Sequence, residues 1–323
     1  EILGATNGTL VRGKIDWTVE RFCSDTRILR KGDVFVALRG ANFDGDKFVP
    51  AAISGGASGA ICHSSFVGGL DDRRTFVITV EDTTKAFGQI ARLWRNKLAL
   101  KVCAITGSSG KTTTKELLAH LCEDSANVLY TEGNKNNHIG LPLTLLRLTE
   151  DHEAAIVELG MNHAGEIEYL TRIAEPNFGI LTNIGDAHIG NFPNHDALID
   201  AKGELFATMP ENRTAVFNAD CEFSRKVAAR QQQKEIIFFG ESEEAQVRAI
   251  DVRPCKPFGY EFTLDLFGVR MEVYLPVFGR YQVGNALAAA TGASLLGVPA
   301  QRIGTQLSTF RPPDMRSEIL YLG

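Results

Sequence analysis

The chain has 323 residues, of which 44% are hydrophobic and 23% charged, an ordinary globular composition that excludes a mainly disordered protein. At roughly 150 residues per domain, this length predicts about two domains. The 34 lysine and arginine residues against 39 acidic ones give a net charge of −5, and with no long basic run this excludes nucleic acid as the expected partner.

Membrane insertion and a disulfide framework are also not expected. No apolar run approaches the roughly 20 residues of a membrane helix, and no signal-like segment opens the chain. The six cysteines form no C-x-x-C pair, which favours a reducing compartment. We therefore expect a soluble, cytoplasmic protein, and we separately expect a monomer. The chain begins at Glu1 and ends at Gly323 after an apolar run, so we also expect a longer parent protein.

The first part of the chain predicts a small α/β domain over residues 1–99. Three β-rich runs lie at 33–38, 58–63 and 75–80. Helical patterns lie between the first two runs and, after the third, over 83–99.

Strands alternate with helices from residue 100 to 312, and this predicts a doubly wound, mainly parallel central sheet. The expected strands are 101–106, 154–159, 178–183, 214–219 and 235–240, and the expected helices are 112–123, 165–174 and 196–208. Alternating polarity around a Phe-Gly pair predicts an antiparallel hairpin over 260–276 at the sheet edge, and the small-residue run 285–297 predicts a closely packed helix.

The segment AITGSSGKTTTKELLAHL (104–121) predicts a phosphate-binding loop between a strand and a helix. Gly107 and Gly110 permit a turn whose backbone N–H groups point inward, and the helix adds the positive end of its dipole. Lys111 would contact the outer phosphates of a nucleotide, and the Thr112 hydroxyl would bind Mg²⁺. The loop is a shortened G-x-x-G-K-T variant of the general motif. The alternative is a polar strand-to-helix turn without a ligand.

Further metal ligands are expected at the carboxyl edge of the same sheet. Glu158 ends one strand, and Asp186 and His188 follow the next. Glu158 could instead cap a helix, and His188 could be a hydrogen-bonded loop histidine. Lys202 falls in a predicted helix, where an isolated lysine is normally solvated, unless CO₂ converts its neutral amine into a carbamate that binds metal.

Six segments together resemble the Mur ligase family: 24–49, 106–116 (TGSSGKTTTKE), 133–148 (GNKNNHIGLPLTLLRL), 158–167 (ELGMNHAGEI), 183–192 (NIGDAHIGNF) and 201–206 (AKGELF). The resemblance implies an N-terminal domain that holds a UDP sugar, a central ATPase domain of P-loop type and a C-terminal Rossmann-like domain. That third domain is absent from the chain, so residues 313–323 are expected to be a linker or its start. The fragment alone is expected to be inactive.

Within the family, the segments at 133–148 and 158–167 match the member that acts on a tripeptide. The resemblance implies an ADP-forming amide ligase that joins D-alanyl-D-alanine to UDP-N-acetylmuramoyl-tripeptide in peptidoglycan precursor synthesis. ATP would phosphorylate the tripeptide carboxylate, and the dipeptide amine would attack the acyl phosphate.

The resemblance also assigns residues to roles. Phosphate binding falls on Gly107, Ser108, Ser109, Gly110 and Lys111; one Mg²⁺ falls on Thr112 and Glu158, and a second on Glu158, His188 and a carbamate of Lys202. Adenine and ribose contacts fall on Asn285 and Arg316. Substrate contacts fall on Ser24, Thr26, Arg27, Asn42, Phe43 and Asp44 and on the pair Asn136 and Asn137. From the residues alone, the asparagine pair and the Ser-Asp-Thr run could equally be plain turns.

Besides the missing third domain, one departure from the family pattern and two alternative functions remain open. The chain has Gly279, Arg280, Tyr281 and Gln282 where the family commonly has G-R-H-N. A folate polyglutamylating or other Mur-type ligase would share the phosphate loop, although residues 24–49 argue against the folate enzyme. A non-catalytic nucleotide-binding module is the alternative from another class.

Overall fold

The computed structural model describes residues 1–14, 17–40, 43–66, 75–231 and 234–312. Contacts divide the chain into two compact units, Glu1–Lys97 and Leu98–Gly323. Asn42, Arg316 and the segment 313–323 lie outside the described residues. No helix in the described ranges is long and apolar enough to cross a membrane.

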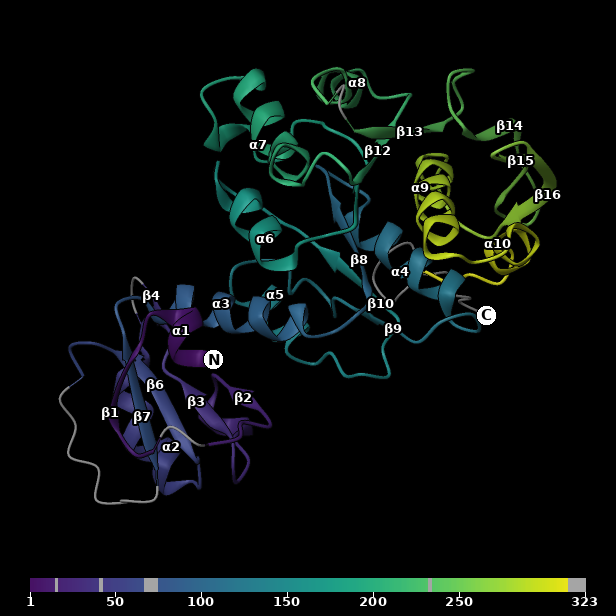
Figure 1. The fold of residues 1–323 in the computed structure, drawn as a ribbon. Helices are drawn as coiled ribbons and strands as arrows, with labels where there is room; N and C mark the ends of the chain where they lie inside the picture. Colours follow the sequence, from purple (N-terminus) through teal and green to yellow (C-terminus); the bar gives the residue numbers. More distant parts are fainter. Residues whose placement is uncertain (15–16, 41–42, 67–74, 232–233, 313–323) are drawn as a thin grey trace. The chain divides into compact units, whose positions relative to one another are not determined.

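The N-terminal unit is built on a five-stranded sheet in the order β1-β7-β6-β3-β2 (Figure 1). Its parallel strands are β2 (Phe22–Cys23), β3 (Val34–Val36), β6 (Gly59–His63) and β7 (Phe76–Val80), and β1 (Thr9–Arg12) pairs antiparallel with β7. Its helices are α1 (Ile2–Thr6), α2 (Val49–Ser54) and α3 (Thr83–Asn96), with the short 3₁₀ turns η1 (Thr26–Ile28) and η2 (Gly45–Phe48). A separate pair of two-residue strands, β4 (Arg39–Gly40) and β5 (Phe43–Asp44), is antiparallel.

The predictions for this unit are confirmed where the apolar runs are long. β3, β6 and β7 lie in the three predicted runs, and nearly all of their residues are buried, as parallel strands covered on both faces require. Strands β1, β2, β4 and β5 were not predicted, because two to four residues carry too little alternation to be recognised.

The second unit is built on a nine-stranded sheet in the order β16-β15-β14-β13-β12-β11-β8-β10-β9 (Figure 1). Its parallel strands are β8 (Lys101–Thr106), β9 (Val128–Tyr130), β10 (Ala154–Glu158), β11 (Phe178–Leu181), β12 (Thr214–Asn218), β13 (Glu235–Gly240) and β14 (Val247–Pro254). Strands β15 (Tyr260–Leu266) and β16 (Val269–Leu275) continue the sheet antiparallel. The predicted doubly wound, mainly parallel sheet and its edge hairpin are confirmed.

The helices of this unit are α4 (Lys111–Cys122), α5 (Gly140–Leu145), α6 (Glu166–Ala174), α7 (His195–Thr208), α8 (Glu222–Ala229), α9 (Tyr281–Leu296) and α10 (Ala300–Leu307), with the 3₁₀ turn η3 (Ile189–Asn191). They cover both faces of the sheet. A Cβ built on Gly179 would meet Leu205 of α7, whereas the next residue, Ile180, packs against Gly292 of α9. Successive residues of a strand point to opposite faces, so α7 and α9 lie on opposite sides of β11.

Several features of this unit differ from the sequence predictions, since strand β9 and helices α5, α8 and α10 were not among the expected elements. Strand β14 was not predicted, because VRAIDVRP places three charged residues and a proline in a run of eight. Helix α9 begins at Tyr281 rather than Asn285, so the Gly-Arg-Tyr-Gln departure lies at its start.

Candidate functional site

The phosphate loop connects β8 to α4, and at two of its positions only glycine fits without strain or steric clash. Gly107 has φ +146° and Gly110 has φ +79°, conformations that side chains rarely adopt. A Cβ on Gly107 would lie 2.1 Å from the Thr182 hydroxyl oxygen, and one on Gly110 would lie 2.2 Å from the Asn285 amide oxygen. The loop is therefore enclosed by Thr182, which follows β11, and by Asn285 of α9.

The loop is also held by the segment that follows β11, in which the sequence reasoning missed Thr182 and Asn183. The Ser108 Oγ donates to the Gly185 carbonyl and accepts from the Gly185 N–H, both at 3.0 Å. The Ser109 N–H donates to the Asn183 Oδ1 at 3.1 Å, and the Thr182 hydroxyl donates to the Ser109 carbonyl at 2.6 Å. Thr182 and Asn183 follow β11 at the carboxyl edge of the sheet, so the rule that drew attention to Glu158 would also have found them.

Two lysines meet at one carbonyl of this loop. The Lys111 Nζ donates to the Gly107 carbonyl at 2.8 Å, and the Lys202 Nζ donates to the same oxygen at 3.4 Å. Lys202 is only 1% exposed, so its helix position is not a solvated surface position. Burial, and to a smaller extent the charge of Lys111, lowers the pKa of Lys202 to about 8. The loop therefore borders a strongly electropositive space.

That space is a cavity of about 630 Å³. Its lining includes Lys111, Lys202 and His188, and burial followed by the charges of Lys202 and Lys111 lowers the pKa of His188. Asp186 takes a different place, because its largely exposed carboxylate lies 3.5 Å from the His195 ring nitrogen. Lining residues that the sequence reasoning did not single out include Asn134, His138, Met161, Asn162, Glu166 and Tyr169.

Glu158 is the buried carboxylate of the site, at 2% exposure. Its Oε2 accepts from the Thr112 hydroxyl and its Oε1 from the Asn136 Nδ2, each at 2.8 Å. The donors are thus side chains, not the N–H groups of a helix end. Asn137 differs from its neighbour, since its Oδ1 accepts from the N–H groups of Ile139 and of Gly140, the first residue of α5.

The side-chain donors suit a Mg²⁺ ion at Thr112 and Glu158 better than a second Mg²⁺ ion at Glu158 and His188. The Thr112 hydroxyl and the Glu158 carboxylate are adjacent oxygen donors, the kind Mg²⁺ prefers beside phosphates. Across the described part of the chain, no group of three or more His, Cys, Asp and Glu side chains could hold a metal ion. A second Mg²⁺ at Glu158 and His188 would therefore need a further anionic ligand, because an intact Lys202 ammonium repels a cation.

Asn285 lies beside the loop from the α9 side. It is 5% exposed, and its Nδ2 donates to the Gln282 Oε1 at 2.7 Å. Its amide oxygen is the atom that approaches Gly110. The adenine contact expected of Asn285 and the contact expected of Arg316 stay predictions.

Several of the residues expected to bind uridine contact other residues of the N-terminal unit. The Arg27 guanidinium bonds to the Asp25 carboxylate and lowers the pKa of Asp25 to about 2. Thr26 begins η1, two residues after Ser24. Phe43 is 53% exposed and stacks on Phe48 at 5.5 Å. Among the described residues, no hydrogen bond joins the turn at Ser24–Arg27 to the strand β5 that carries Asp44.

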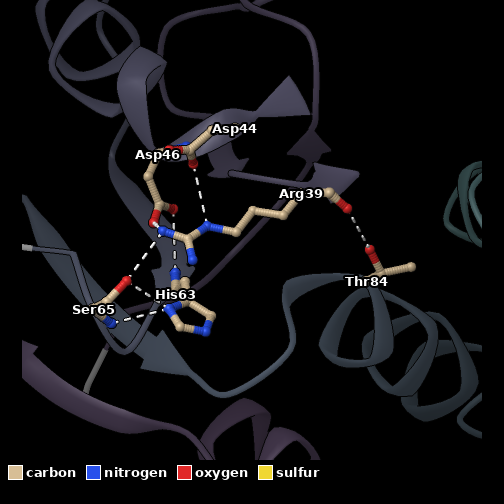
Figure 2. Close-up of polar contacts among 6 residues, drawn as sticks. All are labelled: Arg39, Asp44, Asp46, His63, Ser65 and Thr84. Atoms are coloured by element: carbon tan, nitrogen blue, oxygen red, sulfur yellow. Dashed lines mark hydrogen bonds and ion pairs between the residues drawn. The ribbon is translucent and has the colours of Figure 1, made fainter. Parts of the chain in front are cut away.

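An ion-pair cluster holds strand β5 in place. Figure 2 shows the Arg39 guanidinium between two aspartates and Ser65. Arg39 bonds to Asp44 at 3.2 Å and to the buried Asp46 at 2.6 Å. Asp46 also accepts from the His63 N–H at 3.2 Å, which ties β4 and β5 to β6. Asp44 therefore has a structural role here, and Arg39 and Asp46 are residues that sequence reasoning missed.

A family model and individual relatives both match this chain to the same protein family. The sequence model of the Mur ligase middle domain matches residues 105–293. The UDP-N-acetylmuramoyl-tripeptide–D-alanyl-D-alanine ligases of Synechocystis and Escherichia coli are 38% and 35% identical to this chain over 92% of its length. The chain covers 63% and 64% of the lengths of these two relatives.

Solved structures agree with the sequence matches. A crystal structure of MurF from Acinetobacter baumannii is 34% identical, with a TM-score of 0.89 over 98% of this chain and 68% of that one. The MurF ligase of Thermotoga maritima in complex with ADP is 27% identical, with a TM-score of 0.82 over 93% of this chain and 68% of that one. The chain belongs to the Mur ligase family.

Proposed function

We propose that this chain carries the nucleotide-binding and precursor-binding parts of an ATP-dependent, ADP-forming ligase that adds D-alanyl-D-alanine to UDP-N-acetylmuramoyl-tripeptide in peptidoglycan synthesis. The observation that carries the proposal is the cavity in which Lys111 and Lys202 share the Gly107 carbonyl. Thr112, which follows Lys111 on α4, donates to Glu158 at the end of β10. The names of the relatives at 35% and 38% identity supply the substrates.

In this proposal the chain acts by positioning and by neutralising charge. The loop from Gly107 to Gly110 and the Lys111 ammonium would hold the phosphates of ATP, and the Ser108 and Ser109 N–H groups, which donate to Asn183 in this structure, would exchange that partner for phosphate. Thr112 and Glu158 hold a Mg²⁺ ion, which supplies charge neutralisation when bound. Asn136 keeps the Glu158 carboxylate oriented.

The proposed reaction has two steps. The γ-phosphoryl group passes from ATP to the terminal carboxylate of the tripeptide, giving an acyl phosphate and ADP. The amine of D-alanyl-D-alanine then attacks the acyl carbon, so that a C–N bond forms, the C–O bond to phosphate breaks, and the amine loses a proton. The electropositive cavity would stabilise the oxyanion of the tetrahedral intermediate.

We further propose that Lys202 is carbamylated in the active enzyme. Its burial and its pKa of about 8 support this, because CO₂ reacts with the neutral amine. The adduct would turn a buried cation beside Lys111 into an anion and would give Glu158 and His188 a third partner for a second Mg²⁺. Incubation with ¹³CO₂ should give a carbamate signal in the ¹³C NMR spectrum that Lys202→Met abolishes; an unchanged signal would reject the assignment.

The remaining assignments are proposals as well. Ser24, Thr26, Arg27, Asn42, Phe43 and Asp44 would contact uridine, Asn136 and Asn137 the region between substrate and phosphates, and Asn285 and Arg316 the adenosine part of ATP. Because ATP and UDP-linked precursors are cytoplasmic metabolites, the proposed reaction places the protein in the cytoplasm. We propose that it acts as a monomer.

Calorimetric titration of the purified chain tests the proposal. We expect MgADP and UDP-N-acetylmuramoyl-tripeptide each to bind, and D-alanyl-D-alanine-dependent ATP turnover to be slow, since the chain covers only 63% of its Synechocystis relative. Binding of MgADP with no binding of the UDP precursor would favour the non-catalytic nucleotide module. Binding of a reduced folate in place of the UDP precursor would favour the folate enzyme.

A further inference from the structure

Lys115 is a buried lysine outside the residues used so far. Its side chain is 0% exposed, although an ammonium group is costly to remove from water without strong partners. It lies on α4 one turn after Lys111, so the helix that begins at the phosphate loop carries both lysines. A buried charge so close to the site needs an explanation.

The partners of Lys115 lie in the segment that leaves β9. Its Nζ donates to the Thr131 carbonyl and, at 3.5 Å, to the Gly133 carbonyl. Its charge is balanced by the Glu116 carboxylate at 2.7 Å, and the Tyr130 ring centroid lies 5.6 Å away. The lysine therefore fastens the start of the segment from Thr131 to Asn137 to α4.

The same segment supplies two contacts to Glu158. The Thr131 hydroxyl accepts from the Glu158 N–H at 3.0 Å, and the Asn136 Nδ2 donates to the Glu158 Oε1 at 2.8 Å. The other carboxylate oxygen accepts from Thr112, which lies on α4 like Lys115. Glu158 is thus held between α4 and a segment that Lys115 ties to α4.

We propose that Lys115 is a positioning residue for the Glu158 carboxylate. By fixing the Thr131 and Gly133 carbonyls, its ammonium keeps Asn136 at hydrogen-bond distance from Glu158, so that the carboxylate is presented with Thr112 to Mg²⁺. This inference rests on the proposed function, because it assumes that Mg²⁺ and a nucleotide bind at this site. It predicts that Lys115 acts on the metal-dependent part of nucleotide binding and not on the phosphate loop itself.

Calorimetric titration of ADP into the full chain, with Mg²⁺ or with EDTA, separates the two parts. We expect Lys115→Met to raise the Kd of ADP about tenfold with Mg²⁺ and less than about twofold with EDTA, and Asn136→Ala to do the same. Because both act through one contact, the double variant should again lose about tenfold rather than about a hundredfold. Lys234→Met is the matched control, since Lys234 also donates to two carbonyls, those of Met209 and Pro210, outside the cavity lining.

The outcomes separate this inference from the proposed function. If the unmodified chain binds no ADP with or without Mg²⁺, both are overturned. If it binds MgADP, but Lys115→Met weakens binding equally with Mg²⁺ and EDTA, has no effect, or adds fully to Asn136→Ala, only the positioning role is overturned. Should Lys115→Met fail to fold, Lys115→Gln, which keeps a donor for the Thr131 carbonyl, takes its place. The same titrations with Mg²⁺ and with EDTA, alone and combined with Asn136→Ala, are then judged by the same outcomes.

Discussion

The two units differ in how far apart in the sequence the predicted binding residues and their hydrogen-bond partners lie. In the second unit, Lys111, Glu158 and Lys202 come from distant parts of the chain and meet around one loop. In the N-terminal unit, Arg27 and Asp44 bond to partners two and five residues away in the sequence. A phosphate site is specified by backbone geometry and charge, which a motif encodes, whereas a site for a base and sugar depends on scattered side chains that a motif does not identify.

The strongest test of this comparison is Lys111→Met. Removing the ammonium that we expect to face the phosphates should raise the Kd of MgADP by about a hundredfold or more, because charge-assisted contacts to phosphate are among the strongest polar interactions. The affinity for the UDP precursor should stay unchanged. Lys101→Met is the control, since the exposed Lys101 donates to the Leu295 carbonyl and lies outside the cavity lining. An unaltered MgADP affinity in Lys111→Met would contradict the loop assignment.

Gly107→Ala should have the next largest effect. The new Cβ would lie 2.1 Å from the Thr182 Oγ1 at a φ that alanine rarely adopts, so we expect the free energy of unfolding to fall by about 2–4 kcal/mol and MgADP affinity to fall at least tenfold. Chemical denaturation and calorimetry measure the two changes. Gly190→Ala, whose Cβ meets nothing within 4 Å, should leave both values near those of the parent. Equal behaviour of the two variants would mean that the loop relaxes freely.

Lys202 allows a pH test of the electropositive cavity. Its pKa is lowered from 10.5 to about 8, so between these values the unfolded state binds more protons, and this lysine makes stability rise with pH across that window. In CO₂-free buffer at pH 7, Lys202→Met should therefore increase the free energy of unfolding, by up to about 3 kcal/mol, and the gain should shrink toward pH 10. The exposed Lys226→Met should show no such trend. A pH-independent difference would mean that the ammonium is not destabilised by burial.

The smallest effect is expected at Arg39 in the N-terminal unit. Arg39→Met leaves the buried Asp46 without its guanidinium partner, which should cost about 1–3 kcal/mol of stability and weaken UDP-precursor binding a few-fold, with MgADP affinity unchanged. Arg30→Met, at an exposed position of the same unit, is the control. An unchanged precursor affinity would separate the β4–β5 pair from the uridine site and sharpen the difference between the units.

The parts of the fold that could be predicted share a physical cause. Long apolar runs such as β8 and β10 are buried on both faces, and the glycines of the phosphate loop are needed for positive φ values. Strand β14 was missed because its charged residues mask its alternation. Its strand state follows from pairing with β13 and β15, which is a tertiary effect.

The candidate site likewise depends in part on tertiary contacts that the sequence does not reveal. Glu158 was predictable because it ends a buried strand. The same rule could have drawn attention to Thr182 and Asn183 after β11. The contacts that these two residues and Lys115 make were not predictable, since each depends on which backbone carbonyl or N–H lies opposite it in the folded chain. Arg39 and Asp46 were missed for the same reason.

The strand order has a consequence for how the chain is made. β8, which ends at the phosphate loop, is synthesised before both of its neighbours, because β10 begins at Ala154 and β11 at Phe178. Such pairings over long sequence separations form late in folding. The residues that enclose the loop, Thr182 and Asn285, leave the ribosome later still. A chain cut after Ala174 would therefore contain the whole Gly-Lys-Thr signature and yet hold no phosphate.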